Sequence, residues 1–308
     1  MPTTPHLDVP DQTGRLAVVT GASDGIGAVI ARRLAAAGAE VVLPVRSAAK
    51  GDRVAAHIRS VVPGASVRVV PLDLSRLASV AELTAQLRDE GRPVHLLVNN
   101  AGVMRPPSRQ ETADGFELQV GTNHLGHVAL TLGMLPLLRA GHARVTHQTS
   151  VAARSGTLDL DDFAQQRRDY DVMRAYRASK IAVGLFAREL DARSRAAGWG
   201  ITSNLAHPGV SPTNLLAAQP GMGREKAGGE RRVIEALSRL GVLGTVESAA
   251  LPALMAATAP AGAGDEFFGP RRTVGGSPTR LPHWKPMTDL ATAQGLWDVS
   301  AELTLPRA

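Results

Sequence analysis

The chain has 308 residues, 44% of them hydrophobic, so it can bury a large core in one or two domains. It contains no cysteine, which excludes disulfides, a thiolate nucleophile and a cysteine-ligated metal. Its net charge is +6, but the arginines are scattered and aromatic residues make up only 3% of the chain, which argues against a nucleic-acid partner.

The first residues predict an arm rather than a targeting segment. Residues 1–13 contain three prolines and are expected to form an extended N-terminal arm, and residues 14–308 are expected to form a single domain. No positively charged region followed by an apolar run begins the chain, and no apolar stretch approaches the roughly 20 residues of a membrane helix. We therefore expect a cytoplasmic protein with no membrane partner.

Apolar runs and helical periodicity alternate along the chain. Residues 16–20 are a short apolar run bounded by turn residues, which predicts a buried strand. A glycine-rich turn and a helix to about Ala37 follow. Further strands are predicted at 41–45, 67–72, 94–98, 144–149, 201–206 and near 266–268, and helices at 51–61, 77–90, 112–140, 173–197, 245–257 and 289–303. This alternation predicts an α/β fold, a single Rossmann-type doubly wound parallel sheet flanked by helices on both faces.

Polar or glycine-rich clusters follow several of the predicted strands. They begin at Gly21, Asp73, Asn99, Ser150 and His207. Ligands of such sheets bind beyond the carboxyl ends of the strands, so these clusters are expected to gather at one edge and form the site.

The first cluster has two interpretations. Gly21, Gly25 and Gly27 let backbone N–H groups approach a pyrophosphate at a helix N-terminus, although the spacing differs from the general dinucleotide fingerprint. The same turn fits G-x-S-x-G, the nucleophile elbow of hydrolases, with Ser23 as nucleophile. Only 20 residues precede Gly21, which leaves little room for the earlier strands of that fold. A serine hydrolase is therefore the less favoured alternative.

Tyr176 and Lys180 lie one helical turn apart on one face of a predicted helix. A nearby ammonium group favours the phenolate and lowers the tyrosine pKa from its ordinary value of about 10. Tyr176 could then exchange a proton with a carbonyl or alcohol oxygen. Tyr170 and Arg174 have the same spacing, but we favour Tyr176 because lysine completes its pattern.

Taken together, the motifs resemble those of the short-chain dehydrogenase/reductase family. They occur over about residues 14–270 in the family's order, as Thr20-Gly21-x-x-x-Gly25-Ile26-Gly27, Asn99-Asn100-Ala101-Gly102, Asn123, Ser150, Tyr176-x-x-x-Lys180 and Pro208-Gly209-x-x-x-Thr213. Within the family, the context of Ser150, the segment 157–170 and the run 207–210 resemble the retinol-dehydrogenase-like branch. Residues 145–148 depart from the pattern, because they are more polar than the family's usual strand.

The resemblance implies roles for individual residues. Tyr176 would be the acid–base group, and Lys180 would bind the nicotinamide ribose and lower the tyrosine pKa. Ser150, rather than its neighbour Thr149, would hydrogen-bond the substrate oxygen, and Asn123 would anchor a water. The implied cofactor-binding residues are Gly21, Ser23, Asp24, Gly25, Ile26, Gly27, Arg46, Asp73, Leu74, Asn100, Ala101, Gly102, Tyr176, Lys180, Pro208, Gly209, Val210 and Thr213.

The residues after the second predicted strand bear on the choice of cofactor. An acid about 20 residues beyond the glycine-rich turn would bind a ribose 2′-hydroxyl and favour NAD. This position holds Arg46 instead, which can face a 2′-phosphate with help from Lys50. The sequence therefore favours NADP, with NAD as the alternative.

The expected function is that of an NADP-dependent oxidoreductase that interconverts a carbonyl and an alcohol of a small molecule. The alternative is a non-catalytic NADP-binding sensor or scaffold, because fold does not determine function. The glycine-rich stretch within 210–232 is expected to be a mobile substrate segment, and relatives often form homo-oligomers. His124 and His127 could suggest a metal pair, but no third ligand has suitable spacing, so no metal is expected.

Overall fold

The computed structural model describes residues 5–163, 169–212, 230–240, 242–259 and 264–304. An eight-stranded sheet runs through it in the order β3-β2-β1-β4-β5-β6-β7-β8. Strands β1 to β7 are parallel, and β8 is antiparallel to β7. The strands are β1 (Leu16–Val19), β2 (Glu40–Val45), β3 (Val67–Pro71), β4 (Leu96–Asn99), β5 (Arg144–Gln148), β6 (Thr202–Ala206), β7 (Phe267–Pro270) and β8 (Pro278–Leu281).

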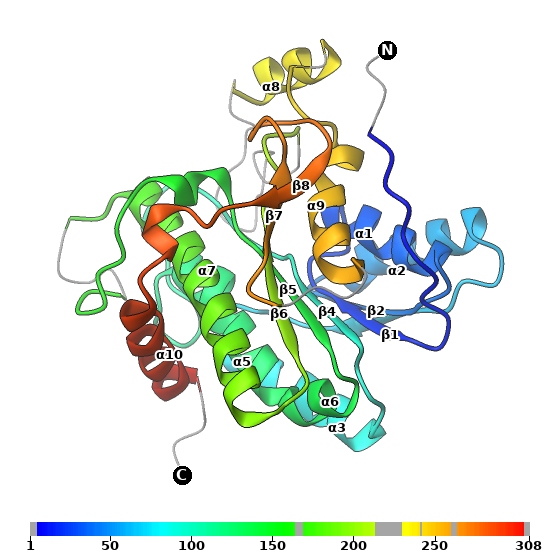
Figure 1. Cartoon of the computed structure of the whole chain (residues 1–308), viewed down its shortest axis with the longest axis horizontal. Helices are drawn as coiled ribbons and strands as arrows, with labels where there is room; N and C mark the ends of the chain where they lie inside the picture. Colours follow the sequence, from blue (N-terminus) through cyan, green and yellow to red (C-terminus); the bar gives the residue numbers. More distant parts are fainter. Residues whose placement is uncertain (1–4, 164–168, 213–229, 241, 260–263, 305–308) are drawn as a thin grey trace.

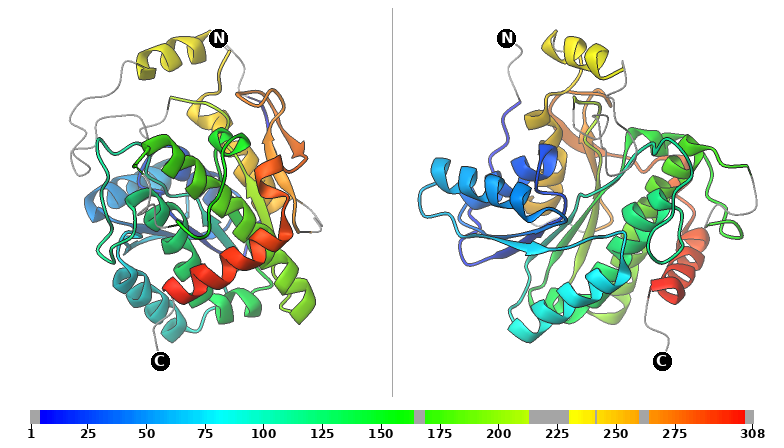
Figure 2. Two further views of the ribbon diagram at one scale, coloured as in Figure 1. Left: turned by 90° about the vertical axis from the view of Figure 1, so that its left-hand side faces the viewer. Right: turned by 180° about the vertical axis from the view of Figure 1, so that it is seen from behind.

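Helices cover both faces of the sheet (Figures 1 and 2). One face packs against α1 (Gly25–Ala36), α2 (Ala48–Val61) and α9 (Val246–Thr258). The other packs against α3 (Leu77–Glu90), α5 (Gly126–Gly133), α6 (Leu135–Ala140) and α7 (Val172–Ala197). Apolar residues of the strands fill both interfaces, as expected for a sheet buried on two sides. The predicted doubly wound α/β fold is confirmed.

The helix predicted at 112–140 is partly wrong. It begins as a short turn, α4 (Leu118–Val120), passes through a π-helical turn, η1 (Gly121–Leu125), and breaks between α5 and α6 at Met134. Glu117 ends the preceding loop, and its carboxylate accepts a hydrogen bond from the N–H of Val120. A π-helical turn inside a helix is rare and often marks a functional site.

Two other elements were not predicted. Strand β8 lies after the last strand that the sequence analysis predicted, near 266–268. Helix α8 (Glu230–Arg239) overlaps the end of the predicted mobile segment, whose residues 213–229 lie outside the described residues. The arm at 5–13 has no helix or strand, yet Leu7 and Val9 pack against the core and Gln12 is buried.

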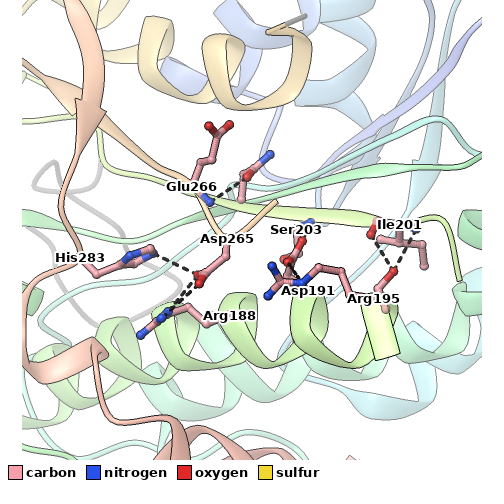
Figure 3. Close-up of polar contacts among 10 residues, drawn as sticks. Arg188, Asp191, Arg195, Ile201, Ser203, Asp265, Glu266 and His283 are labelled. Carbon is pink, nitrogen blue, oxygen red and sulfur yellow. Dashed lines mark hydrogen bonds and ion pairs between the residues drawn. The ribbon is translucent and has the colours of Figure 1, made fainter. Parts of the chain in front are cut away.

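Polar contacts fasten the middle of α7 to the start of β7 (Figure 3). Arg188 donates from Nε and Nη2 to the two carboxylate oxygens of Asp265 at 2.9 and 3.1 Å, and His283 Nε2 lies 3.3 Å from the same carboxylate. Further along α7, the buried Asp191 accepts a hydrogen bond from the N–H of Ser203 at 3.0 Å. These contacts hold in place the helix that carries the predicted acid–base tyrosine.

The last helix, α10 (Leu290–Thr304), lies along the outer side of α7 (Figure 1). Trp297 stacks on Phe186 of α7, with ring centroids 5.1 Å apart. Ser300 Oγ lies 2.8 Å from Nε2 of His124 in the π-helical turn. The C-terminal helix therefore buries the outer sides of α7 and of the turn that carries Asn123.

Candidate active site

The glycine-rich turn lies at the carboxyl edge of the sheet, where the strand order reverses between β1 and β4. Doubly wound sheets bind their ligands at this switch point. Gly21 has a φ of +66°, and a Cβ on it would lie 2.8 Å from Ala101 Cα. Only glycine permits that approach, so the turn at 21–27 and the segment 100–102 form one cradle. Asp24 caps α1 beside it, with Oδ1 accepting from the N–H of Gly25 at 2.7 Å.

Thr20 and Asn100 hold the cradle together. Thr20 Oγ1 accepts hydrogen bonds from the N–H groups of Asn100 and Ala101 at 2.9 and 3.0 Å. The Asn100 side chain donates to the Thr20 carbonyl at 2.9 Å and accepts from Gln148 Nε2 at 3.0 Å, so it joins the ends of β1, β4 and β5. The sequence analysis did not select Thr20 as a site residue, although its place at the end of the first apolar run was a signal.

Lys180 and Asn123 converge on Gly102 at the end of the cradle. A Cβ on Gly102 would lie 3.3 Å from Lys180 Nζ and 3.2 Å from Asn123 Oδ1. Lys180 is 5% exposed and donates to the Gln148 carbonyl at 3.0 Å. The Asn123 side chain accepts from the N–H of Val103 at 2.7 Å and donates to its carbonyl at 3.0 Å. The ammonium group is thus held next to the segment that lines the cradle.

Tyr176 lies one turn before Lys180 on α7, and its phenol hydrogen-bonds with the Ser150 side chain. Ser150 lies two residues after the end of β5 and caps the 3₁₀ turn η2 (Val151–Arg154). Thr149, the other hydroxyl considered, is buried and donates to the carbonyl of Lys180 at 2.6 Å. The structure therefore brings Ser150, not Thr149, against the phenol.

Burial controls the protonation of both Tyr176 and Lys180. It raises the pKa of Tyr176 above its ordinary value, and the hydrogen bond with Ser150 acts in the opposite direction. It lowers the pKa of Lys180 from 10.5 to about 8, because a buried ammonium group loses its hydration. The lowered Tyr176 pKa that the resemblance implied is not seen here, since burial of the phenol is the larger effect.

Comparison with protein families agrees with this geometry. The model of the short chain dehydrogenase family matches residues 15–222. The chain belongs to the short-chain dehydrogenase family.

Individual relatives confirm the retinol-dehydrogenase-like resemblance. Polyprenol dehydrogenase of Mus musculus is 42% identical over 212 residues, which cover 67% of this chain and 63% of that protein. Retinol dehydrogenase 13 of Homo sapiens is 41% identical over 203 residues, which cover 66% of this chain and 60% of that protein. The match therefore spans less than two thirds of the length of these relatives.

Solved structures share the fold over more of the chain. The crystal structure of an uncharacterized protein from Mycobacterium Paratuberculosis has a TM-score of 0.77 at 33% identity and covers 96% of both chains. The Pseudomonas aeruginosa RhlG/NADP active-site complex has a TM-score of 0.64 at 27% identity, over 84% of this chain and 95% of that chain.

In this short-chain dehydrogenase, His127 connects the π-helical turn to the cradle. Its Nδ1 donates to the carbonyl of Asn123 at 2.9 Å. Burial lowers the pKa of His127 to about 4, so the ring is neutral at physiological pH and its Nε2 carries no proton. Nε2 then accepts a hydrogen bond from the Thr20 hydroxyl at 2.9 Å. His127 is thus a supporting residue that the sequence analysis considered only for metal binding.

The remaining predicted cofactor residues follow other strands at the same edge. Arg46 comes directly after β2 and is exposed. Asp73, after β3, accepts hydrogen bonds from the N–H and hydroxyl of Ser75, and Leu74 is buried. Pro208, Gly209 and Val210 follow β6. Thr213 lies outside the described residues.

The polar residues of strand β5 lie in the core, and so do His124 and His127, the two histidines considered for a metal. His147 of β5 packs edge-on against Phe186 at 5.5 Å, and burial lowers its pKa to about 3. Burial likewise lowers the pKa of His124 to about 3. In the described part of the chain, no three His, Asp or Glu side chains are grouped so that they could hold a metal ion. No described helix is long and apolar enough to cross a membrane.

Tyr170, the second tyrosine, is fastened to a buried carboxylate. Its hydroxyl donates to Glu117 Oε1 at 2.9 Å, and Glu117 is 0% exposed. Gln119 Nε2 donates to the Tyr170 hydroxyl at 3.3 Å and to the carbonyl of Val172 at 2.9 Å. These bonds join α4 to the first turn of α7. Sequence patterns do not reveal them, because 53 positions separate Glu117 from Tyr170.

Replacing Tyr170 by Phe removes this hydroxyl and leaves a buried carboxylate oxygen without its shortest side-chain donor. We expect the free energy of unfolding to fall by about 1–3 kcal/mol, which urea denaturation would measure. Turnover should fall far less than in a Tyr176→Phe variant, because the predicted proton donor remains. A Tyr170→Phe protein as stable as the wild type would show that the Glu117 contact contributes nothing.

Proposed function

We propose that the chain is an NADP-dependent oxidoreductase that interconverts a carbonyl and an alcohol, with Tyr176 as the acid–base group. The convergence of Tyr176, Ser150 and Lys180 beside the glycine cradle carries this proposal. A protein that only bound a nucleotide would need the cradle but not these side chains.

The cradle fits the pyrophosphate of a nicotinamide dinucleotide. Gly21 allows the close approach described above, and a Cβ on Gly27 would lie 2.6 Å from Asn100 Nδ2. Backbone N–H groups at the N-terminus of α1 can therefore meet phosphate oxygens without a side chain between them. When bound, the nicotinamide would supply or accept the hydride.

Tyr176 and Ser150 would handle the oxygen of the substrate. In the reducing direction, Tyr176 donates its hydroxyl proton to the carbonyl oxygen while Ser150 hydrogen-bonds the same oxygen. Lys180 stabilises the tyrosinate that remains, because its positive charge lies one helical turn away. In the oxidising direction, the tyrosinate accepts the proton of the alcohol. With a pKa of about 8, Lys180 is mostly protonated at neutral pH.

The relatives support the reaction class. Polyprenol dehydrogenase and retinol dehydrogenase 13 are named for alcohols, and we carry over only the oxidation of an alcohol and its reverse. The RhlG structure contains NADP, which supports a nicotinamide cofactor. The serine-hydrolase alternative gains no support, because among the described residues no histidine is hydrogen-bonded to the Ser23 hydroxyl.

The reaction class can be tested by following NADPH oxidation with a panel of ketones, aldehydes and quinones, beside parallel assays with NADH. We expect turnover with at least one carbonyl and a preference for NADPH. Tight NADPH binding without turnover of any carbonyl would instead favour the sensor or scaffold.

Replacing Arg46 by Ala should weaken NADPH binding by about tenfold or more, because a charge-assisted contact with the 2′-phosphate is lost. NADH lacks that phosphate, so its affinity should change little. Isothermal titration with both cofactors measures the difference. If the affinities for NADPH and NADH fell equally, Arg46 would not bind the 2′-phosphate.

A further inference from the structure

The loop at 103–105 continues the chain directly from Gly102 of the cradle. Arg105 in this loop has a φ of +55°, in the left-handed region that a residue with a side chain seldom adopts. A backbone in such a conformation persists only where the surrounding structure holds it there. The loop is therefore fixed by its neighbours rather than by its own conformational preference.

Two buried amide side chains of the α4–η1 segment (118–125) hold this loop. Asn123 Oδ1 accepts a hydrogen bond from the N–H of Val103 at 2.7 Å. Gln119 Oε1 accepts one from the N–H of Arg105 at 2.9 Å. Both amide side chains are 0% exposed, so water does not compete for these bonds. Gln119, four residues before Asn123, thus does at one end of the loop what Asn123 does at the other.

The nitrogens of the same two amides bind α7. Asn123 Nδ2 donates to Ser179 Oγ at 3.0 Å. The Ser179 hydroxyl in turn donates to the carbonyl of Tyr176 at 2.8 Å. Gln119 Nε2 donates to the carbonyl of Val172 at 2.9 Å. Tyr176 therefore lies between two points at which α7 is fastened to the α4–η1 segment, four residues after Val172 and three before Ser179.

The orientation of the Gln119 amide follows from two further neighbours. Its Nε2 lies 3.5 Å from Glu117 Oε1 and 3.3 Å from the Tyr170 hydroxyl. A carboxylate only accepts hydrogen bonds, and the Tyr170 hydroxyl already donates its hydrogen to this one, so both groups require the NH2 end of the amide. The amide oxygen is left for the N–H of Arg105. Glu117 and Tyr170 thus orient Gln119 so that it joins the loop to α7.

We infer that Gln119 is a positioning residue for the proposed reaction, because it fastens the turn of α7 that carries Tyr176 to the loop that continues the cradle. The inference rests on the proposed function and adds to it a residue that is completely buried and so acts through its neighbours. A displacement of about 1 Å between reacting groups can lower a rate by about a hundredfold. Thr20 and Asn100 hold the cradle through bonds that do not involve Gln119, so cofactor affinity does not depend on it.

The test replaces Gln119 by Met, which has a similar length and no hydrogen-bond donor. The matched control is Gln12→Met, because Gln12 is also buried and its amide also donates to a backbone carbonyl, that of Pro10 in the N-terminal arm. The arm meets α1 at Ala37, the end of the helix away from the glycine-rich turn. Gln119→Asn, whose side chain is one methylene group too short to make both bonds, is the second variant should Gln119→Met not fold.

Thermal denaturation gives a temperature at which the variants are folded. At that temperature, steady-state rates with the best carbonyl of the panel give kcat and KM, and isothermal titration gives the Kd of NADPH. Hydrogen exchange followed by mass spectrometry reports how well the amides of 103–105 and 172–176 are protected, and it needs no substrate.

We expect Gln119→Met to lower kcat by about ten- to a hundredfold at an unchanged Kd for NADPH, and to speed hydrogen exchange in both segments. Gln12→Met should lose stability but keep the kcat of the wild type. Equal kcat values in the two variants would overturn the inference, and so would unchanged hydrogen exchange in Gln119→Met. A loss of NADPH affinity as large as the loss of kcat would also overturn it, because Gln119 would then support the cradle. A wild type that turned over no carbonyl would overturn the proposed function together with this inference.

Discussion

A Tyr176→Phe variant is expected to lose turnover by about a hundred- to ten-thousand-fold while it binds NADPH nearly as tightly as the wild type. The phenol oxygen is the group that would exchange the proton with the substrate, and its removal leaves the ring packing intact. Tyr176 is 3% exposed, and its hydroxyl hydrogen-bonds with Ser150. The cradle at 21–27 does not contain this hydroxyl, so cofactor affinity should be preserved.

The matched control is Tyr170→Phe, which removes the same atom from the other tyrosine of the chain. Steady-state rates with the best carbonyl of the panel and a direct titration of NADPH separate chemistry from binding. If Tyr176→Phe retained a rate close to that of Tyr170→Phe, Tyr176 would not be the proton donor.

Replacing Lys180 by Met is expected to stabilise the protein at neutral pH and to abolish turnover. Burial lowers the pKa of Lys180 from 10.5 to about 8, so the folded state bears the cost of a buried ammonium group whenever that group is charged. A shift of this size corresponds to about 3 kcal/mol, and Met of similar length removes the charge. Turnover is lost because the tyrosinate no longer has its nearby cation.

The pH dependence of this effect has a definite sign. Below the folded-state pKa, both states hold the proton and the burial cost is complete. Between about 8 and 10.5, the unfolded chain binds more protons than the folded one, so the free energy of unfolding of the wild type rises with pH. Lys180→Met lacks this rise, and its advantage should therefore disappear above that window.

Urea denaturation of the wild type and of Lys180→Met, at pH values on both sides of this window, measures the difference directly. Subtracting the free energy of unfolding of one protein from that of the other cancels the contributions of all other titrating groups, because both proteins contain them. An advantage of the Met variant that did not change with pH would contradict a depressed Lys180 pKa. A variant less stable than the wild type at neutral pH would show that the contact with the Gln148 carbonyl outweighs the cost of burial.

Local pattern was enough to predict most elements and the edge at which the candidate site lies. Apolar runs fill both faces of a parallel sheet, so β1 to β7 stand out from the polar turns that follow them. Short motifs indicated the chemistry, with Gly21 and Ser150 at those turns and Tyr176 and Lys180 on the predicted helix at 173–197. Because the carboxyl ends of parallel strands share an edge, the sequence alone placed these clusters together.

The sequence by itself thus determined the alternation of strands and helices, the fold class and the residue types at the strand ends, because periodicity and turn chemistry act over a few neighbouring residues. Tertiary structure alone decided the rest. Thr20 meets His127 across 107 positions, and Glu117 meets Tyr170 across 53. Such partners are chosen by packing and by the need to satisfy buried polar groups, and neither leaves a periodic trace along the chain.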